Sequence, residues 1–243
     1  MNINRRKFLI TGLSYSAVVA SARLPAQETN QPPSVPDSKL PAEVVRKRGP
    51  QALEQVYAFV GAGHRDLARV KEMIVQDPQL VFAARDWGGG DWETALGGAS
   101  HTGHREIARY LLSQGARIDS FCAAMLGERD LMLALLKAEP SVTTTKGPHG
   151  YTLLYHVAIS GDVSVAEAMK PLLPAEAKDY NQALSAAARD GHLEMTKWLL
   201  KNGVTDPNVP DGFNKTALMF AVEKKFPEIE AELRSHGADE KEK

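Results

Sequence analysis

Cysteine is nearly absent from this sequence, because Cys122 is the only one among 243 residues. A single cysteine cannot form an internal disulfide, and it cannot supply the thiolate pair of a structural zinc site. Because Cys122 stands between the apolar residues Phe121 and Ala123, we expect it to be a small buried core residue. Any fold of this chain must therefore be stable without internal disulfide bonds.

Excess positive charge is missing too. The chain has 29 Lys and Arg against 30 Asp and Glu, which gives a formal net charge of −1. Binding to nucleic acid or to an anionic membrane surface calls for a basic face, and this composition gives no sign of one. We therefore predict neither partner.

Catalytic and metal-binding motifs are also missing. His101 and His104 stand near Glu106, and His149 follows further along, but no local spacing completes a tetrahedral ligand set. The run Gly88–Gly90 lacks the Lys-Ser/Thr pair that follows a phosphate-binding loop. The sequence therefore predicts no catalytic residues, no metal and no cofactor.

What the sequence does contain is a fragment that recurs. The pattern Gly-His-x-Glu occurs at residues 103–106 and 191–194, and each copy is followed by a Leu-Leu pair and then by a Gly. Further glycines in the same register stand at 127 and 161, while Lys225 fills that position in a last copy. Irregular recurrence near a period of about 33 residues predicts helix-turn-helix units that bury their apolar faces against their neighbours.

This pattern resembles the ankyrin repeat over residues 52–239. The resemblance implies an all-α ankyrin-repeat solenoid of about six imperfect helix-turn-helix units, in which the two outer units are atypical. Thr94, Thr152 and Thr216 stand where a hydroxyl can cap the first helix of a unit. The recurring Gly suits the left-handed residue that ends that helix.

Several positions depart from the family pattern. The third unit runs from Asp119 straight into apolar residues, which leaves no room for a protruding loop and predicts two short helices only. The fourth unit has Pro171 and Pro174 in its second helix, so this helix should end early or kink. The family's histidine after the capping Thr is replaced by other residues, so its hydrogen bonds between units are not predicted. The replacements are Gly97, Tyr155 and Met219.

The first 22 residues look like a twin-arginine export signal, and they predict a periplasmic or secreted protein. The mildly apolar stretch of residues 9–20 is shorter than the about 20 residues of a membrane helix, so no stable span is expected after processing. The alternative is a cytosolic chain with a basic N-terminal helix. The signal has an arginine pair, Arg5 and Arg6, followed by the apolar pair Phe8 and Leu9. Its small-x-small cleavage motif is formed by Ala20 and Ala22.

Two further segments complete the predicted organisation. Residues 23–48 are rich in proline and poor in apolar residues, which predicts a disordered linker. Residues 49–240 then form the ankyrin repeat domain.

A glycine-rich acidic segment, residues 86–93, contains two of the three tryptophans. Tryptophan is enriched at binding hot spots, so we expect this segment to be a protruding recognition loop, although each indole could instead fold back onto the helices. The predicted function is that of a monomeric, non-enzymatic scaffold which binds an unidentified protein or peptide through its loops and concave face. A small-ligand or cell-wall sensor is the first alternative, and an enzyme with a groove site is the second. The candidate partner-binding residues are Asp86, Trp87, Asp91, Trp92, Glu93, His149 and Tyr151.

Replacement of both Arg5 and Arg6 by Lys should block export, because the paired guanidinium groups are what the twin-arginine receptor would read. Cell fractionation measures the result. Normal accumulation of the double variant in the periplasm would contradict the assignment.

Overall fold

The computed structural model describes residues 51–173, 177–212 and 214–239. The predicted signal and linker, residues 1–48, lie outside this part of the chain. In the described residues, no helix is both long and apolar enough to cross a membrane.

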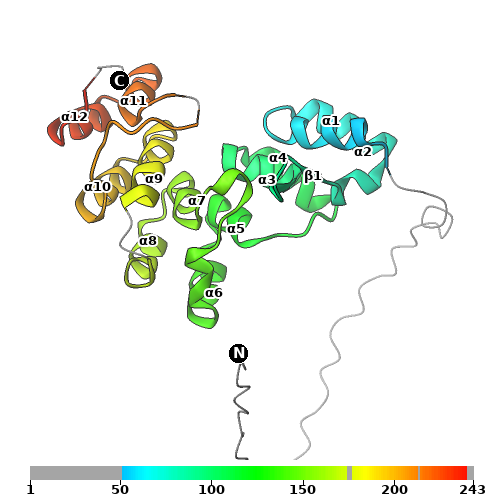
Figure 1. The fold of residues 1–243 in the computed structure, drawn as a ribbon, viewed down its shortest axis with the longest axis horizontal. Helices are drawn as coiled ribbons and strands as arrows, with labels where there is room; N and C mark the ends of the chain where they lie inside the picture. Colours follow the sequence, from blue (N-terminus) through cyan, green and yellow to red (C-terminus); the bar gives the residue numbers. More distant parts are fainter. Residues whose placement is uncertain (1–50, 174–176, 213, 240–243) are drawn as a thin grey trace, which may run out of the picture. The chain divides into compact units, whose positions relative to one another are not determined.

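The described chain is built from helix pairs, and it confirms the predicted all-α solenoid of six units (Figure 1). The first helices of consecutive units contact one another along the whole row, and each second helix packs against the first helix of its own unit. The pairs are α1 (Leu53–Gly63) with α2 (Leu67–Gln76), α3 (Ala95–Thr102) with α4 (Arg105–Ser113), and α5 (Ser120–Leu126) with α6 (Arg129–Ala138). They continue with α7 (Leu153–Ser160) and α8 (Val163–Met169), α9 (Ala177–Arg189) and α10 (Leu193–Asn202), and α11 (Ala217–Lys224) and α12 (Pro227–Ser235).

The predicted capping residues begin and end the first helices. The hydroxyl of Thr94 accepts a hydrogen bond from the amide of Gly97 at 3.0 Å, and Thr152 and Thr216 cap α7 and α11 in the same way. The recurring glycines adopt the left-handed conformation, and Lys225 does so with φ of 60°. In the first unit the residue that ends α1 is His64, which is right-handed, so this outer unit turns without a left-handed residue.

The fourth unit behaves as predicted, and the third does so in part: it has no hairpin and α5 is short, but α6 has ten residues, as many as α2 and α10. In the third unit α5 and α6 follow a short connection without a hairpin, and the carboxylate of Asp119 caps α5 through the amide of Cys122. In the fourth unit α8 ends at Met169, and a 3₁₀ turn, η4 (Lys170–Leu172), carries the chain past Pro171.

The core runs through all six units. Leu111 and Leu199 are buried, while Leu112 and Leu200 are half-buried at its edge. Cys122 is buried as expected, and burial raises the pKa of its thiol to about 12. Tyr155 occupies a position where the family has histidine, and its hydroxyl donates to the carbonyl of His101 at 3.0 Å. A hydrogen bond between units is therefore made here by a different side chain.

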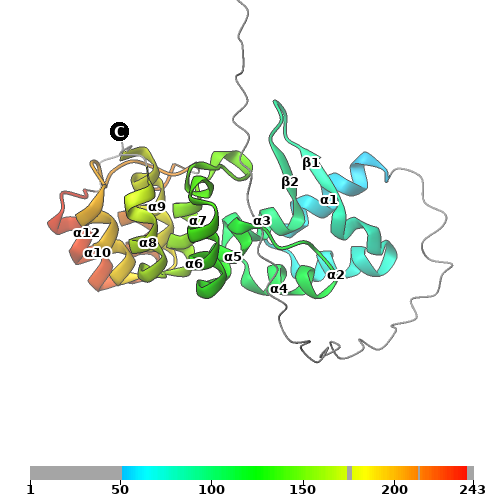
Figure 2. The same ribbon diagram turned by 90° about the horizontal axis from the view of Figure 1, so that it is seen from below.

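The segment of residues 86–93, predicted as a protruding loop, contains the turn of a β-hairpin, and this strand pairing was not predicted. The strands β1 (Ala84–Asp86) and β2 (Trp92–Thr94) pair antiparallel, with Arg85 opposite Glu93. The turn closes because Gly88, Gly89 and Gly90 all adopt positive φ, which costs little without a Cβ. Figure 2 shows this hairpin standing out beside α1 and α3.

The connections, where the structure describes them, contain three 3₁₀ turns in addition to η4. They are η1 (Pro78–Phe82), η2 (Pro140–Thr144) and η3 (Pro148–Gly150). The last of these lies in the loop of residues 146–151, which precedes α7.

Replacement of Leu199 by Ala should lower the free energy of unfolding by about 2–5 kcal/mol, because it removes buried apolar surface and leaves a cavity. Leu131 is the matched control, because it is exposed on α6, and its change to Ala should cost below about 0.5 kcal/mol. Urea denaturation followed by circular dichroism measures both. Equal losses for the two variants would contradict the proposed core.

Candidate functional site

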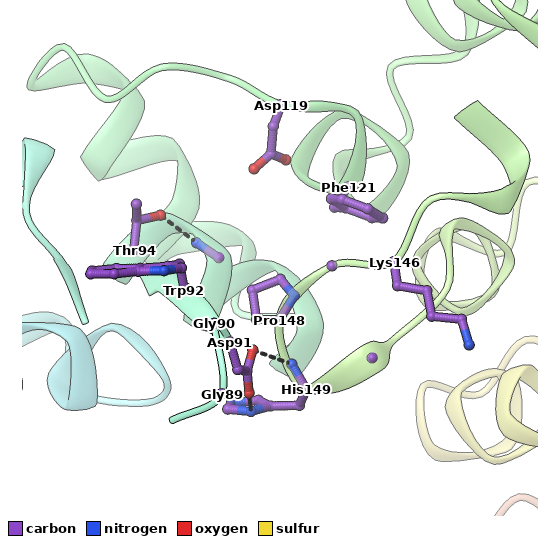
Figure 3. Close-up of a pocket in the computed structure, with 13 residues that line it drawn as sticks. Gly89, Gly90, Asp91, Trp92, Thr94, Asp119, Phe121, Lys146, Pro148 and His149 are labelled. Atoms are coloured by element: carbon purple, nitrogen blue, oxygen red, sulfur yellow. Dashed lines mark hydrogen bonds and ion pairs between the residues drawn. The ribbon is translucent and has the colours of Figure 1, made fainter. Parts of the chain in front are cut away.

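The hairpin forms one wall of an open hollow, which we call the hairpin hollow and which measures about 700 Å³. The loop of residues 146–151 forms the opposite wall, and the beginning of α5 closes one end (Figure 3). Because the third unit has no hairpin of its own, the hairpin before α3 and the loop before α7 face each other directly. Side chains that line the hollow include Asp91, Trp92, Asp119, Phe121, Pro148 and His149.

The two indoles of the hairpin have different surroundings. Trp92 is 61% exposed and lines the hollow. Trp87 is 39% exposed, and its Nε1 donates to Oε2 of Glu93 at 2.7 Å. The guanidinium of Arg85 covers the Trp87 ring at 3.5 Å from its centroid. Trp92 is therefore available for contact with a partner, whereas Trp87 anchors the hairpin.

Asp91 joins the two walls of the hollow. Its carboxylate accepts from the backbone amide of His149 at 2.9 Å and contacts Nδ1 of the same residue at 2.8 Å. His149 can turn toward Asp91 because its backbone is left-handed, with φ of 58°. A two-point contact of this kind fixes the position of the loop relative to the hairpin turn.

Three histidines surround the carboxylate of Glu93, which is only 1% exposed. We call His64, Glu93, His101 and His149 the histidine cluster. The Nε2 atom of His101 lies 2.9 Å from Oε1, and the Nε2 atoms of His64 and His149 lie 3.3 Å and 3.6 Å from Oε2. Every histidine thus presents the same ring nitrogen to one carboxylate.

The electrostatics of the cluster follow from this convergence. Burial alone would raise the pKa of Glu93, but hydrogen bonds and charge from His101 and His64 outweigh burial and lower the pKa to about 2. Burial also opposes the charged form of His64, yet its contacts with Glu93 prevail and raise its pKa. For the more deeply buried His101, burial prevails and its pKa is lowered. The carboxylate is therefore ionised, and His64 shares a proton with it more readily than His101 does.

Small residues on α3 make room for the cluster. A Cβ at Gly98 would meet the His64 ring at 2.8 Å, and a Cβ at Gly97 would meet Glu93 Cγ at 3.3 Å. Tyr151 covers His101, because the two rings stack at 5.2 Å with an angle of 15°. The absence of the family's usual side chain at position 97 thus has a structural reason.

The predicted site residues divide into three groups. Asp91, Trp92 and His149 line the hollow, as a partner-binding role requires. Asp86 instead accepts from the amide of Gly88 in the turn. The remaining three form or support the histidine cluster and are Trp87, Glu93 and Tyr151.

Sequence reasoning did not identify His64 or His101 as site residues, and it found no metal-ligand set. The cluster draws its members from the end of α1, from β2, from α3 and from η3, so no local spacing reveals it. Their positions in the repeat could have predicted that His64 and His101 lie close together, because both stand near the ends of the first helices of adjacent units. Equivalent positions of adjacent units lie side by side in a stacked array.

Replacement of Glu93 by Gln should destabilise the metal-free protein by about 1–3 kcal/mol, because an amide cannot accept from Trp87, His64 and His101 together. The control is Glu232→Gln, which alters an exposed contact with His236 and should cost below about 1 kcal/mol. Urea denaturation at pH 7 in the presence of a chelator compares them. A Glu93 variant as stable as the control variant would contradict this description of the cluster.

Comparison with known families addresses the fold. A family model for ankyrin repeats, with three copies, matches residues 120–243, which is half of the chain and begins at α5. The hairpin and three members of the histidine cluster precede the matched region. Ankyrin repeats are generally protein–protein interaction modules and typically non-enzymatic scaffolds. With its paired helices, capping threonines and left-handed glycines, the chain belongs to the ankyrin repeat family.

Proposed function

We propose that this chain is an exported binding scaffold that holds an extended segment of a protein partner in the hairpin hollow. The observation that carries the proposal is the position of Trp92 on the rim of the hollow, 61% exposed. Aromatic anchors of this kind supply much of the binding energy at protein interfaces.

The position of Trp92 in β2 favours a role in recognition. The other two residues of β2 are held in place, because Glu93 is buried in the histidine cluster and Thr94 caps α3. The backbone that carries the indole is thus held in place before a partner arrives, which lowers the entropic cost of binding. Phe121 adds apolar surface at the end of the hollow, and Pro148 adds it on the wall opposite the hairpin.

The shape of the hollow favours a peptide over a small ligand. Its walls are a hairpin and a loop, and the space between them is open to solvent. An extended chain can lie along such a channel, whereas drug-sized ligands are usually enclosed over most of their surface. We therefore rank the small-ligand or cell-wall sensor second.

The place of action is part of the proposal. The arginine pair and the cleavage motif of the first 22 residues support twin-arginine export, so the partner would be met in the periplasm or outside the cell. The binding is non-covalent and the hollow performs no chemistry in this proposal.

Trp92→Ser should weaken partner capture by at least about 10-fold while the melting temperature stays unchanged, because the indole is a solvent-exposed hot spot. The matched control is Phe82→Ser, which removes a 52% exposed aromatic ring outside the hollow and should leave capture normal. Trp87→Ser is expected to lower the melting temperature, because Trp87 holds Glu93.

Quantitative capture from a periplasmic extract and thermal melting are measured on the same preparations. Trp92→Ser protein that captures as much partner as the parent chain would overturn the hollow as the binding site. Equal loss in the Trp92 and Phe82 variants would indicate general surface stickiness and would also overturn it.

A further inference from the structure

We propose that the histidine cluster binds a divalent transition metal ion of the zinc class through the Nε2 atoms of His64, His101 and His149 and one carboxylate oxygen of Glu93. These four ligand atoms all lie within 4.8 Å of one another. Three imidazoles and a carboxylate are a donor set that suits Zn²⁺ and its spectroscopic substitute Co²⁺. The inference is independent of the partner proposed above.

The distances are close to those of a tetrahedral site. Bonds of about 2.0–2.1 Å from zinc to nitrogen and oxygen place neighbouring ligands about 3.3 Å apart. Nε2 of His64 and of His149 lie 3.3 Å and 3.6 Å from Oε2 of Glu93, and Nε2 of His101 lies 2.9 Å from the other oxygen, Oε1. Because the ligand atoms of the four residues lie within 4.8 Å of one another, side-chain rotations would bring the set around an ion.

The outer nitrogens of two histidines are already engaged. Nδ1 of His64 faces the carbonyl of Val60 at 3.0 Å, and Nδ1 of His149 faces the carboxylate of Asp91 at 2.8 Å. Both partners are acceptors, so each Nδ1 bears a proton. This arrangement leaves the Nε2 lone pair directed into the cluster, which is how metal-binding histidines are oriented by their outer hydrogen bonds.

The inner nitrogens then offer a place for a cation. In the neutral form that binds a metal, an imidazole that donates through Nδ1 has a lone pair at Nε2, and in His64 and His149 this nitrogen faces an oxygen of Glu93. In the metal-free chain a proton on Nε2 makes the contact with Glu93 favourable, and a divalent ion would take the place of that proton. A divalent ion would satisfy Nε2 of His64 and of His149 at once, and it would balance the two carboxylates of Asp91 and Glu93.

The composition of the site indicates a structural role. Four protein ligands close a tetrahedral site, whereas catalytic zinc sites keep one position for water. The ligands come from the end of α1, from β2, from α3 and from η3, so the ion would link the hairpin to the first, second and fourth units. Bound metal would thus hold together both walls of the hairpin hollow.

The experiment titrates the purified, chelator-treated full chain with Zn²⁺ by calorimetry and with Co²⁺ by absorption spectroscopy. We expect one ion per chain, the intense visible absorption of four-coordinate Co²⁺, and its loss when Zn²⁺ is added. Zn²⁺ should also raise the melting temperature, because it binds only the folded arrangement.

Two ligand variants preserve the local structure. His101→Gln keeps a side chain that can donate to Glu93, and His149→Asn suits the left-handed backbone. Each should weaken Zn²⁺ binding by more than about 100-fold, whereas Asp91→Asn, which only supports His149, should weaken it by about 10–100-fold. His236→Asn, at the exposed end of α12, is the control and should bind as the parent chain does.

Circular dichroism of the metal-free variants shows whether each is folded. The proposal is overturned if the parent chain fails to bind one Zn²⁺ at micromolar concentrations. It is equally overturned if Co²⁺ gives only the weak spectrum of six-coordinate geometry, or if folded His101→Gln and His149→Asn proteins bind Zn²⁺ as tightly as His236→Asn.

Discussion

Each helix pair in this protein can bury its apolar face only against the pairs beside it, and every other feature of the molecule depends on this constraint. The first helices contact one another from α1 to α11, so the loops that precede them are brought to the same edge of the array. Loops that lie far apart in the chain thereby become neighbours. The hairpin hollow and the histidine cluster both exist because of this alignment.

Much of the fold could be predicted from the sequence because its signals are local. A capping threonine, a left-handed glycine and a Leu pair each act within one helix or one turn, and Thr94, Thr152 and Thr216 cap as expected. The early end of α8 followed from proline chemistry. The protruding segment of residues 86–93 was predicted but its strand pairing was not, because three consecutive glycines indicate flexibility, although here each one adopts a positive φ in the turn.

The site was less predictable because it is assembled across units. Trp87 and Trp92 have the same type and flank the same glycines, yet one binds Glu93 and the other faces solvent. Strand alternation does not separate them, because Trp87 follows β1 and Trp92 begins β2; the difference comes from the buried carboxylate that Trp87 reaches. His64 and His101 carry no local motif at all. Their meeting depends on the close approach of α1 and α3, where a Cβ at Gly63 would collide with the backbone of Ala95 at 2.5 Å. It depends also on the absence of a side chain at Gly98, which leaves room for the His64 ring.

The shortened third unit has no projection in front of its first helix. In a regular array, every unit contributes a projection, and adjacent projections stand one repeat apart with little free space between them. Here the connection before α5 is too short to project, so the hairpin and the loop of residues 146–151 reach each other through Asp91 and His149 and leave the hairpin hollow beside this contact. One short connection therefore gives the array both a recess at the start of α5 and a direct contact between its second and fourth units.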